Sequence, residues 1–271
     1  MSAIDDDDTD EGVVAPGEEL LPGYRVVELL SRGARIDTYD VQSLARRCRC
    51  VVKTVRPDRL DEAHVREAVL TEGRLLSTLT HPHLVRGYDV VERPRPAAVL
   101  ETLGGHTLDA LLERRPLGVL DAARLGRQLG SALAYLHDQG WLHLDVKPEN
   151  VVVDRGRAIL IDLSVAGRPG SGRPGVGTEE YLAPEQRTGV GLATATDVWG
   201  WGLTMVEALT GDLPPDDGPA LPARLHRRPT APRGERVPPE LAALLRGTLA
   251  PDPAGRPTWD DVDAVTGALL D

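Results

Sequence analysis

The residues with the clearest chemical potential lie in the segment HLDVKPEN, which spans 143–150. It places the carboxylate of Asp145 two residues before Lys147 and five residues before the amide of Asn150. A second carboxylate, Asp162, follows after two short apolar runs. Mg²⁺ takes few protein oxygens together with phosphate oxygens, which Asn150 and Asp162 can supply, and Asp145 then remains to orient a hydroxyl group. This spacing predicts a metal–nucleotide site for phosphoryl transfer and leaves several families with such chemistry open.

The elements that position these residues follow from the apolar pattern. Short runs rich in β-branched residues predict strands at 24–30, 48–53, 97–100, 151–153 and 158–161. The last two are joined by Asp154-Arg-Gly-Arg157, which predicts a hairpin. Apolar residues at helical spacing predict helices at 61–79, 107–115, 121–139, 197–209, 239–249 and 258–270. A strand-rich N-terminal part followed by a helical C-terminal part predicts an α+β chain with two lobes.

Six motifs in order along the chain resemble those of the eukaryotic-like (Hanks-type) Ser/Thr protein kinases of bacteria, over about 24–270. They are the strand CVVK ending at Lys53, Glu72 ahead of HP, the catalytic loop HLDVKPEN, the segment GTEEYLAPE, Asp197 in TATDVWGWG and Arg256 in DPAGRP. The resemblance implies the two-lobed protein-kinase fold. Its antiparallel, β-rich N-lobe with one C helix would span about 21–101, its hinge 101–104, and its mostly helical C-lobe 105–271.

The resemblance also implies ATP and Mg²⁺, or Mn²⁺, as cofactors and a protein hydroxyl as acceptor of the γ-phosphoryl group. The residues it implies for nucleotide binding are Lys53 with its ion-pair partner Glu72, Gly33, Val51, Leu100, Glu101 and Leu103. Those for catalysis are Asp145, which would align the hydroxyl, and Lys147, which would neutralise the transferring phosphoryl; those for the metal are Asn150 and Asp162. Those for structural support are His143, Glu185, Asp197 and Arg256, with Thr178 positioning the substrate.

The glycine-rich loop departs from the family pattern. Where three glycines are usual, the chain reads Ser31-Arg-Gly33-Ala-Arg-Ile36 and keeps only the middle one. Glycines there let backbone amides approach phosphates, so Ser31 and Ile36 should weaken that cradle. Thr38 replaces the valine that usually covers adenine. We therefore expect weaker binding of ATP.

Two further departures concern regulation. Leu144 replaces the arginine of the catalytic loop, which normally needs a phosphorylated activation segment to compensate its charge. We therefore expect activity that does not require activation-segment phosphorylation. The metal motif reads Asp162-Leu163-Ser164 in place of Asp-Phe-Gly, and Ser164 lacks the access of glycine to positive φ.

Composition restricts the cellular setting. The formal charge is −11, and the acidic residues of 1–20 account for −8 of it, which predicts a flexible tail or an arm for a basic partner. The acidic total argues against nucleic-acid binding, and no apolar run is long enough for membrane insertion. The start lacks the pattern of a signal peptide, and two cysteines make no disulfide framework, so we expect a cytoplasmic location.

Three functions stay open. An active Ser/Thr protein kinase, with protein substrates and a possible regulatory protein partner, fits the retained chemical residues. A pseudokinase acting as a nucleotide-binding or scaffold module fits the reduced glycine-rich loop. A small-molecule kinase would share the loop carboxylate, Asn150 and Asp162, but it would lack a segment like GTEEYLAPE.

The proline-rich stretch 214–239 looks too irregular for the substrate-docking helix of most relatives.

Overall fold

The computed structural model describes residues 12–213 and 236–271, so most of the proline-rich stretch lies outside the described residues. The chain divides into two compact units. The first, called here the sheet unit, runs to Thr78 and resumes over Arg86–Thr102. The second, the helical unit, comprises Leu79–Val85 and Leu103–Asp271.

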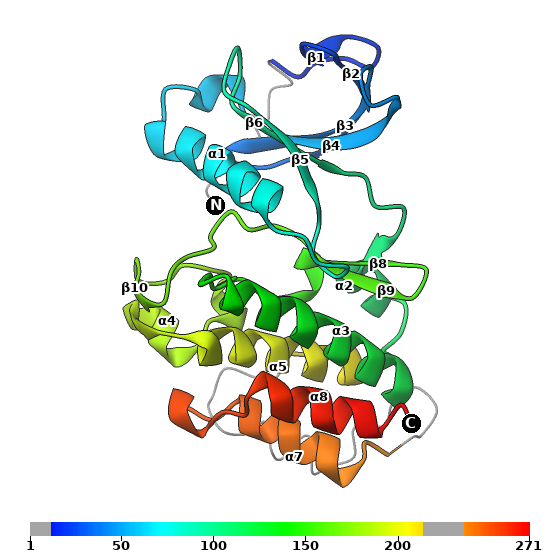
Figure 1. Cartoon of the computed structure of the whole chain (residues 1–271), viewed down its shortest axis with the longest axis vertical. Helices are drawn as coiled ribbons and strands as arrows, with labels where there is room; N and C mark the ends of the chain where they lie inside the picture. Colours follow the sequence, from blue (N-terminus) through cyan, green and yellow to red (C-terminus); the bar gives the residue numbers. More distant parts are fainter. Residues whose placement is uncertain (1–11, 214–235) are drawn as a thin grey trace, which may run out of the picture. The chain divides into compact units, whose positions relative to one another are not determined.

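The sheet unit is a curled antiparallel sheet with one long helix packed against β5 and β6 (Figure 1). The strand order is β1-β2-β3-β4-β6-β5. The elements are β1 (Glu19–Leu21), β2 (Tyr24–Arg32), β3 (Ile36–Ser43), β4 (Cys48–Val55), the 3₁₀ turn η1 (Pro57–Arg59), α1 (Ala63–Thr78), β5 (Gly87–Val91) and β6 (Ala97–Glu101). Alternate side chains of the strands, such as Tyr39, Val41, Cys50 and Val52, are fully buried in one core, as the two-residue period of a strand requires.

Residues 12–20 do not belong to a flexible tail. They have a defined course, and Leu20 and Leu21 are buried in the core of the sheet unit. The backbone N–H of Val14 donates to the hydroxyl of Tyr39 at 3.2 Å. The boundary at residue 20 was therefore wrong, because the apolar residues among the acidic ones bury enough surface to order this part of the segment. Residues 1–11 lie outside the described residues.

The helical unit is built around α5, whose side chains are buried on nearly all sides. Figure 1 shows α3, α5, α7 and α8 lying side by side, and adjacent members of this group are in contact. The helices among its described residues are α2 (Leu108–Leu112), α3 (Val119–Asp138), α4 (Pro184–Thr188), α5 (Thr194–Thr210), α7 (Pro239–Thr248) and α8 (Trp259–Ala268). The short elements are β7 (His106–Thr107), η2 (Pro148–Asn150), β8 (Val151–Asp154), β9 (Arg157–Leu160), β10 (Gly170–Ser171), η3 (Glu179–Tyr181), β11 (Val190–Leu192) and η4 (Pro253–Gly255).

The expected hairpin is formed by β8 and β9. Asp154 pairs with Arg157, which leaves the two-residue turn Arg155-Gly156. Both turn residues have positive φ, 52° and 80°, as a type I′ turn requires, and glycine takes the second position without strain. At the open end, the backbone N–H of Ile161 donates to the carbonyl of Asn150 at 2.8 Å. The hairpin thus brings Asp162 back beside Asn150.

The structure differs from the sequence-based expectation in a domain boundary and in the length of a helix. It also contains strands that the apolar pattern did not predict, namely β1, β3, β5, β7, β10 and β11. The segment 79–85 was assigned to the N-lobe, but it belongs to the helical unit, because Val85 N–H donates to the carbonyl of Leu160 at 3.0 Å. The helix expected at 107–115 ends at Leu112, ahead of Pro116, which disfavours helical conformation in the residue before it. Among the described residues, no helix is long and apolar enough to cross a membrane.

Candidate active site

Asp145 lies at the centre of a group of polar contacts in the helical unit. One of its carboxylate oxygens accepts a hydrogen bond from the backbone N–H of Thr178 at 2.8 Å. The other accepts from the side-chain amide of Asn150 at 2.9 Å and lies 3.6 Å from the ammonium of Lys147. The carboxylate is thus held from two sides, with its side chain 16% exposed. It has the position and the access to accept a hydrogen bond from a substrate hydroxyl.

The orientation of Asn150 fits a role in holding a cation. Its amide nitrogen donates both to the carboxylate and to the backbone carbonyl of Asp145, at 2.9 and 2.8 Å. Both partners are acceptors, so the nitrogen must face them, and the amide oxygen is the atom left for a metal. Asn150 therefore presents a hard oxygen donor next to the carboxylate of Asp145.

Asp162 follows β9 in a left-handed conformation, with φ 65°. Its carboxylate accepts the backbone N–H of Ser164 at 3.0 Å, which turns the chain sharply after the strand. Within 12–213 and 236–271, no three acidic, histidine or cysteine side chains gather as a complete metal site. Asn150 and Asp162 fit Mg²⁺ instead, since this ion is commonly held by one or two protein oxygens plus substrate phosphates.

Thr178 contacts both of the residues expected to do chemistry. Its hydroxyl accepts a hydrogen bond from the ammonium of Lys147 at 2.6 Å, and its backbone N–H binds Asp145. The preceding residue, Gly177, has φ 116°, and a Cβ there would lie 2.6 Å from the carbonyl oxygen of Leu144. Only glycine fits at this position. The close approach of the two segments brings Thr178 to the catalytic loop.

Asp197 of α5 holds the backbone of the catalytic loop in place. Its carboxylate accepts the backbone N–H groups of His143 and Leu144, both at 2.8 Å. The ring of His143 is fully buried and bonds to the carbonyl of Ile161 and the N–H of Asp145. A charged group that organises two loop amides keeps Asp145 in a defined position.

Sequence reasoning missed one partner of Asp197. His137 of α3 bonds through Nε2 to the Asp197 carboxylate at 2.7 Å, while its Nδ1 accepts the indole N–H of Trp259 at 2.9 Å. Trp259 can only donate, so Nδ1 carries no proton and Nε2–H donates to Asp197. No local sequence pattern predicts this contact, because α3, α5 and α8 are far apart in sequence.

Glu185 and Arg256 form the buried pair expected from the motifs. The guanidinium binds both carboxylate oxygens, at 2.6 and 2.9 Å, and its side chain is fully buried. It also donates to the backbone carbonyls of Ala195 and Ala250. The pair therefore ties the end of the segment GTEEYLAPE to α5 and to the loop before α8.

These buried carboxylates predict a loss of stability in acid. Burial disfavours the charged form of Glu185, but the hydrogen bonds from Arg256 outweigh it and hold its pKa below the ordinary 4.5. Burial likewise opposes the ionised form of Asp197, yet its bonds to His137 and the loop keep its pKa below 3.8. A carboxyl group with a lowered pKa in the folded state stabilises the fold fully above the unfolded value and loses this effect as the pH falls through the folded value.

We therefore expect the free energy of unfolding to fall below about pH 4.5. Burial raises the pKa of Glu207, whose contribution has the opposite sign, so a single substitution gives the cleaner test. In urea titrations at pH 7 and pH 3.5, the stability difference between wild type and Glu185→Gln should shrink at the lower pH. A difference of constant size at both pH values would contradict this assignment.

Gln186, which follows Glu185, makes a second contact with the catalytic loop that the sequence did not reveal. Its buried amide nitrogen donates to the carbonyl of Leu144 at 2.9 Å and to that of Val176 at 2.8 Å. Leu144 itself has φ 66° and packs with Leu142 and Leu192 in a small apolar cluster. The stretch 165–186 is therefore attached to the catalytic loop by packing and neutral hydrogen bonds.

The sheet unit carries the residues expected for nucleotide binding. Glu72 lies on the buried face of α1, and its carboxylate accepts from the ammonium of Lys53 at 2.8 Å. Val51 pairs with Leu100, and Lys53 pairs with Thr38, so these four side chains share one face of the sheet. Val51 and Leu100 thus provide apolar surface beside the ammonium of Lys53, a combination suited to a base and its phosphates.

The remaining expected residues lie at the ends of strands. Gly33 is in the turn between β2 and β3, where its N–H bonds to the carbonyl of Ile36 at 2.8 Å. Glu101, in the sheet unit, already donates its backbone N–H to Arg86, so only its carbonyl is available to a base. Leu103 begins the second part of the helical unit.

Comparison with known proteins identifies the family. The protein kinase domain matches residues 24–265. The Ser/Thr-protein kinase PknD of Mycobacterium tuberculosis is 32% identical over 261 residues, which cover 91% of this chain and 39% of that protein. PkaA of Streptomyces coelicolor is 34% identical over 78% of this chain, and pkn2 of Myxococcus xanthus 33% over 76%. The chain belongs to the protein kinase domain family, with the antiparallel sheet and the helical part of that fold.

The chain spans less than half the length of each of these relatives. The matched region is 39% of PknD, 41% of PkaA and 26% of pkn2. The similarity therefore concerns a kinase domain, and the relatives continue beyond it.

Proposed function

We propose that this chain is an ATP-dependent Ser/Thr protein kinase that transfers the γ-phosphoryl group to a protein hydroxyl. The observation that carries the proposal is the set of contacts around Asp145, in which Asn150, Lys147 and Thr178 hold one carboxylate beside a free amide oxygen. Family membership and the Lys53–Glu72 pair support the same assignment. Bound Mg²⁺ would supply charge neutralisation on the phosphates.

Each residue then has a defined part in the reaction. Lys53, oriented by Glu72, binds the α- and β-phosphates, and Asn150 and Asp162 hold the metal. Asp145 accepts the hydrogen bond of the substrate hydroxyl and aligns it with the γ-phosphorus. A serine or threonine acceptor fits better than tyrosine because the bonded Lys147 and Thr178 lie close to Asp145.

The experiment that tests this proposal measures label from γ-labelled ATP on a generic basic protein, with Mg²⁺ or Mn²⁺ present. Label on serine or threonine supports the proposal. A pseudokinase is the second candidate, favoured by the single glycine of turn 33–36. It predicts metal-dependent binding of a fluorescent ATP analogue with no transfer, so the two measurements together separate the candidates.

The proposal includes a protein substrate, a regulatory protein partner and a cytoplasmic location. Cys48 and Cys50 are both free thiols, as expected in a reducing compartment. The net charge of −11 gives no support for a nucleic-acid substrate.

The proposal also includes activity without phosphorylation of the activation segment. Leu144 is buried with Leu142 and Leu192, so the position of the usual arginine carries no charge that a phosphate must compensate. Strand β10 pairs with β11, and Gln186 bonds to the loop, which orders the segment without a phosphate.

We expect that phosphatase treatment changes the transfer rate by less than about twofold, because packing orders the segment. The substitution Ser171→Ala should have an equally small effect, since this exposed residue pairs with β11 through its backbone, which alanine retains. Intact mass spectrometry verifies the absence of phosphate before the assay. A phosphate-free protein with less than a tenth of the original rate would contradict the assignment.

A further inference from the structure

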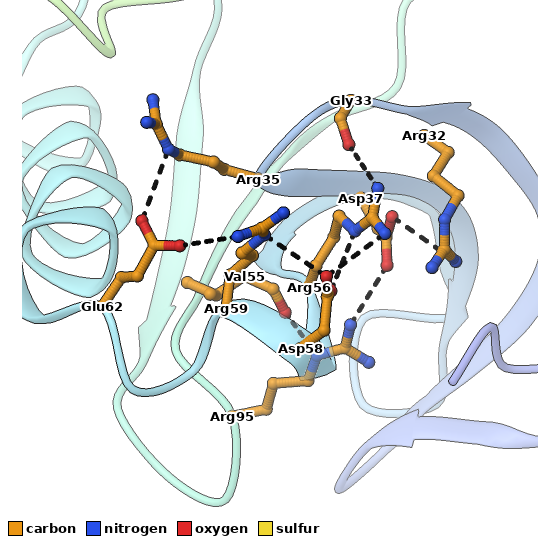
Figure 2. A network of polar contacts seen from close by, with 10 residues as sticks. All are labelled: Arg32, Gly33, Arg35, Asp37, Val55, Arg56, Asp58, Arg59, Glu62 and Arg95. Carbon is orange, nitrogen blue, oxygen red and sulfur yellow. Dashed lines mark hydrogen bonds and ion pairs between the residues drawn. The ribbon is translucent and has the colours of Figure 1, made fainter. Parts of the chain in front are cut away.

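The turn between β2 and β3, residues 33–36, is connected to the end of β4. Two backbone hydrogen bonds close it, from Gly33 N–H to the carbonyl of Ile36 at 2.8 Å and from Arg56 N–H to the carbonyl of Arg35 at 2.9 Å. A side-chain bond is added to these, since the guanidinium of Arg56 donates to the carbonyl of Gly33 at 3.2 Å (Figure 2). The turn is thus held by a side chain that directly follows β4.

Arg56 is itself held in place. Its guanidinium donates to both carboxylate oxygens of Asp58, at 3.0 and 3.4 Å. Only 14% of its side chain is exposed, against 47% for Asp58. A planar guanidinium bound at two of its nitrogens has little freedom left, so its third bond, to Gly33, has a fixed direction.

A second anchor lies on the strand that leaves the turn. Asp37 is fully buried, and its carboxylate accepts from Arg95 at 3.2 Å and lies 4.0 Å from the guanidinium of Arg32. Arg95 comes from the loop between β5 and β6 and also donates to the carbonyl of Val55 at 2.8 Å. Arg95 therefore connects Asp37, near the start of β3, with Val55, at the end of β4 (Figure 2).

We propose that Arg56, Asp58, Arg95 and Asp37, which we call the arginine clamp, take the place of the missing glycines and hold turn 33–36 ready for the phosphates of ATP. Glycines allow a loop to close on phosphates after binding, whereas a turn that is already fixed loses less entropy on binding. Ser31 and Ile36 replace the glycines that would let the loop close after binding. The clamp instead fixes the turn before binding. Arg56 is then a positioning residue for the nucleotide. The inference rests on the proposed function.

The test is Arg56→Ala, which removes the bond to Gly33 and keeps the backbone bond to Arg35. We expect the KM for ATP, or the dissociation constant of a fluorescent ATP analogue with Mg²⁺, to rise about tenfold, as loss of a charged hydrogen bond predicts. The kcat should change less than about threefold, because Arg56 touches no reacting group. Amide hydrogen exchange over 33–36 should become faster.

Arg74→Ala is the matched control. Arg74 lies on α1 of the same unit, and among the described residues its side chain binds Glu67 and Glu92 and makes no hydrogen bond or ion pair to the clamp or the turn. It should leave both the KM and the exchange near wild type, while Arg56→Lys should restore part of the affinity. Asp58→Asn, at an exposed site, loosens Arg56 without removing it and should give a smaller rise of KM, which keeps the test available if Arg56→Ala does not fold.

The outcomes separate this inference from the proposed function. Raised KM, nearly unchanged kcat and faster exchange in Arg56→Ala alone support the clamp. Unchanged affinity in Arg56→Ala and Asp58→Asn overturns it, with transfer by the wild type intact. A wild type that neither binds nor transfers overturns the proposed function, and with it any role of the clamp in nucleotide binding, whatever the exchange of the turn.

Discussion

Asp145→Asn should lower kcat for phosphoryl transfer by about 10²–10⁴-fold, the range that a positioned general base contributes. The physical reason lies in its contacts. The carboxylate accepts from two donors, the N–H of Thr178 and the amide of Asn150. An asparagine has only one acceptor oxygen, so its own NH₂ group must face one of these donors. The substitution therefore removes the carboxylate oxygen that accepts the hydrogen bond of the substrate hydroxyl, and with it the alignment of that hydroxyl.

The matched control is Asp121→Asn, at an exposed carboxylate in the first turn of α3 that pairs only with exposed Arg124 among the described residues. It changes the net charge by the same amount as Asp145→Asn and should leave kcat unchanged. Steady-state kinetics with thermal unfolding of each variant separates a catalytic effect from a folding defect. A folded Asp145→Asn with more than a tenth of wild-type kcat would contradict the role of Asp145.

The largest expected effect on stability comes from Arg256→Met. Its guanidinium is fully buried and satisfies both oxygens of Glu185. Removing it leaves a carboxylate without its counter-charge, at a cost of about 3–5 kcal/mol. In a domain of this size each kcal/mol corresponds to roughly 2–4 °C, so Tm should fall on the order of 10 °C.

Arg124→Met provides the comparison, because it breaks the exposed pair with Asp121, worth about 0–1 kcal/mol. Calorimetry or urea titration measures both variants. Adding Glu185→Met to Arg256→Met should recover part of the loss, since it removes the stranded charge. An Arg256→Met protein within about 1 kcal/mol of wild type would show that Glu185 is hydrated once its partner is gone.

The features that the sequence predicted well are those encoded by residues close together in the chain. The spacing of Asp145, Lys147 and Asn150 and the turn at Arg155-Gly156 each depend on a few consecutive residues. The structure accordingly forms the expected hairpin and places Asn150 beside Asp145. The pairing of Lys53 with Glu72 came from family resemblance, because no local pattern specifies it.

The features that the sequence did not predict join distant segments. Arg95 is 58 positions from Asp37, and His137 is 60 from Asp197. A surface-like residue type gives no sign that tertiary packing will bury it. The boundary predicted at residue 20 was wrong for the same reason. The acidic residues of the segment suggested a solvated chain, whereas Leu20 and Leu21 are buried in the core and Val13 and Val14 pack against it.

The clamp also bears on the choice between an active kinase and a pseudokinase. The reduced number of glycines is the main sequence argument for a pseudokinase. A turn fixed by Arg56 offers another way to prepare the same surface, so the loss of glycines alone does not predict loss of nucleotide binding. The Lys53–Glu72 ion pair is also present, with 2.8 Å between Nζ and Oε1.

The measurement that tests the central claim most directly is transfer of label from γ-labelled ATP by the wild-type chain, followed by analysis of the labelled amino acids. Asp145→Asn is run in parallel. The account predicts label on serine or threonine, with Mg²⁺ or Mn²⁺ required and the signal lost in Asp145→Asn. Metal-dependent binding of nucleotide with no transfer to any protein under these conditions would contradict it.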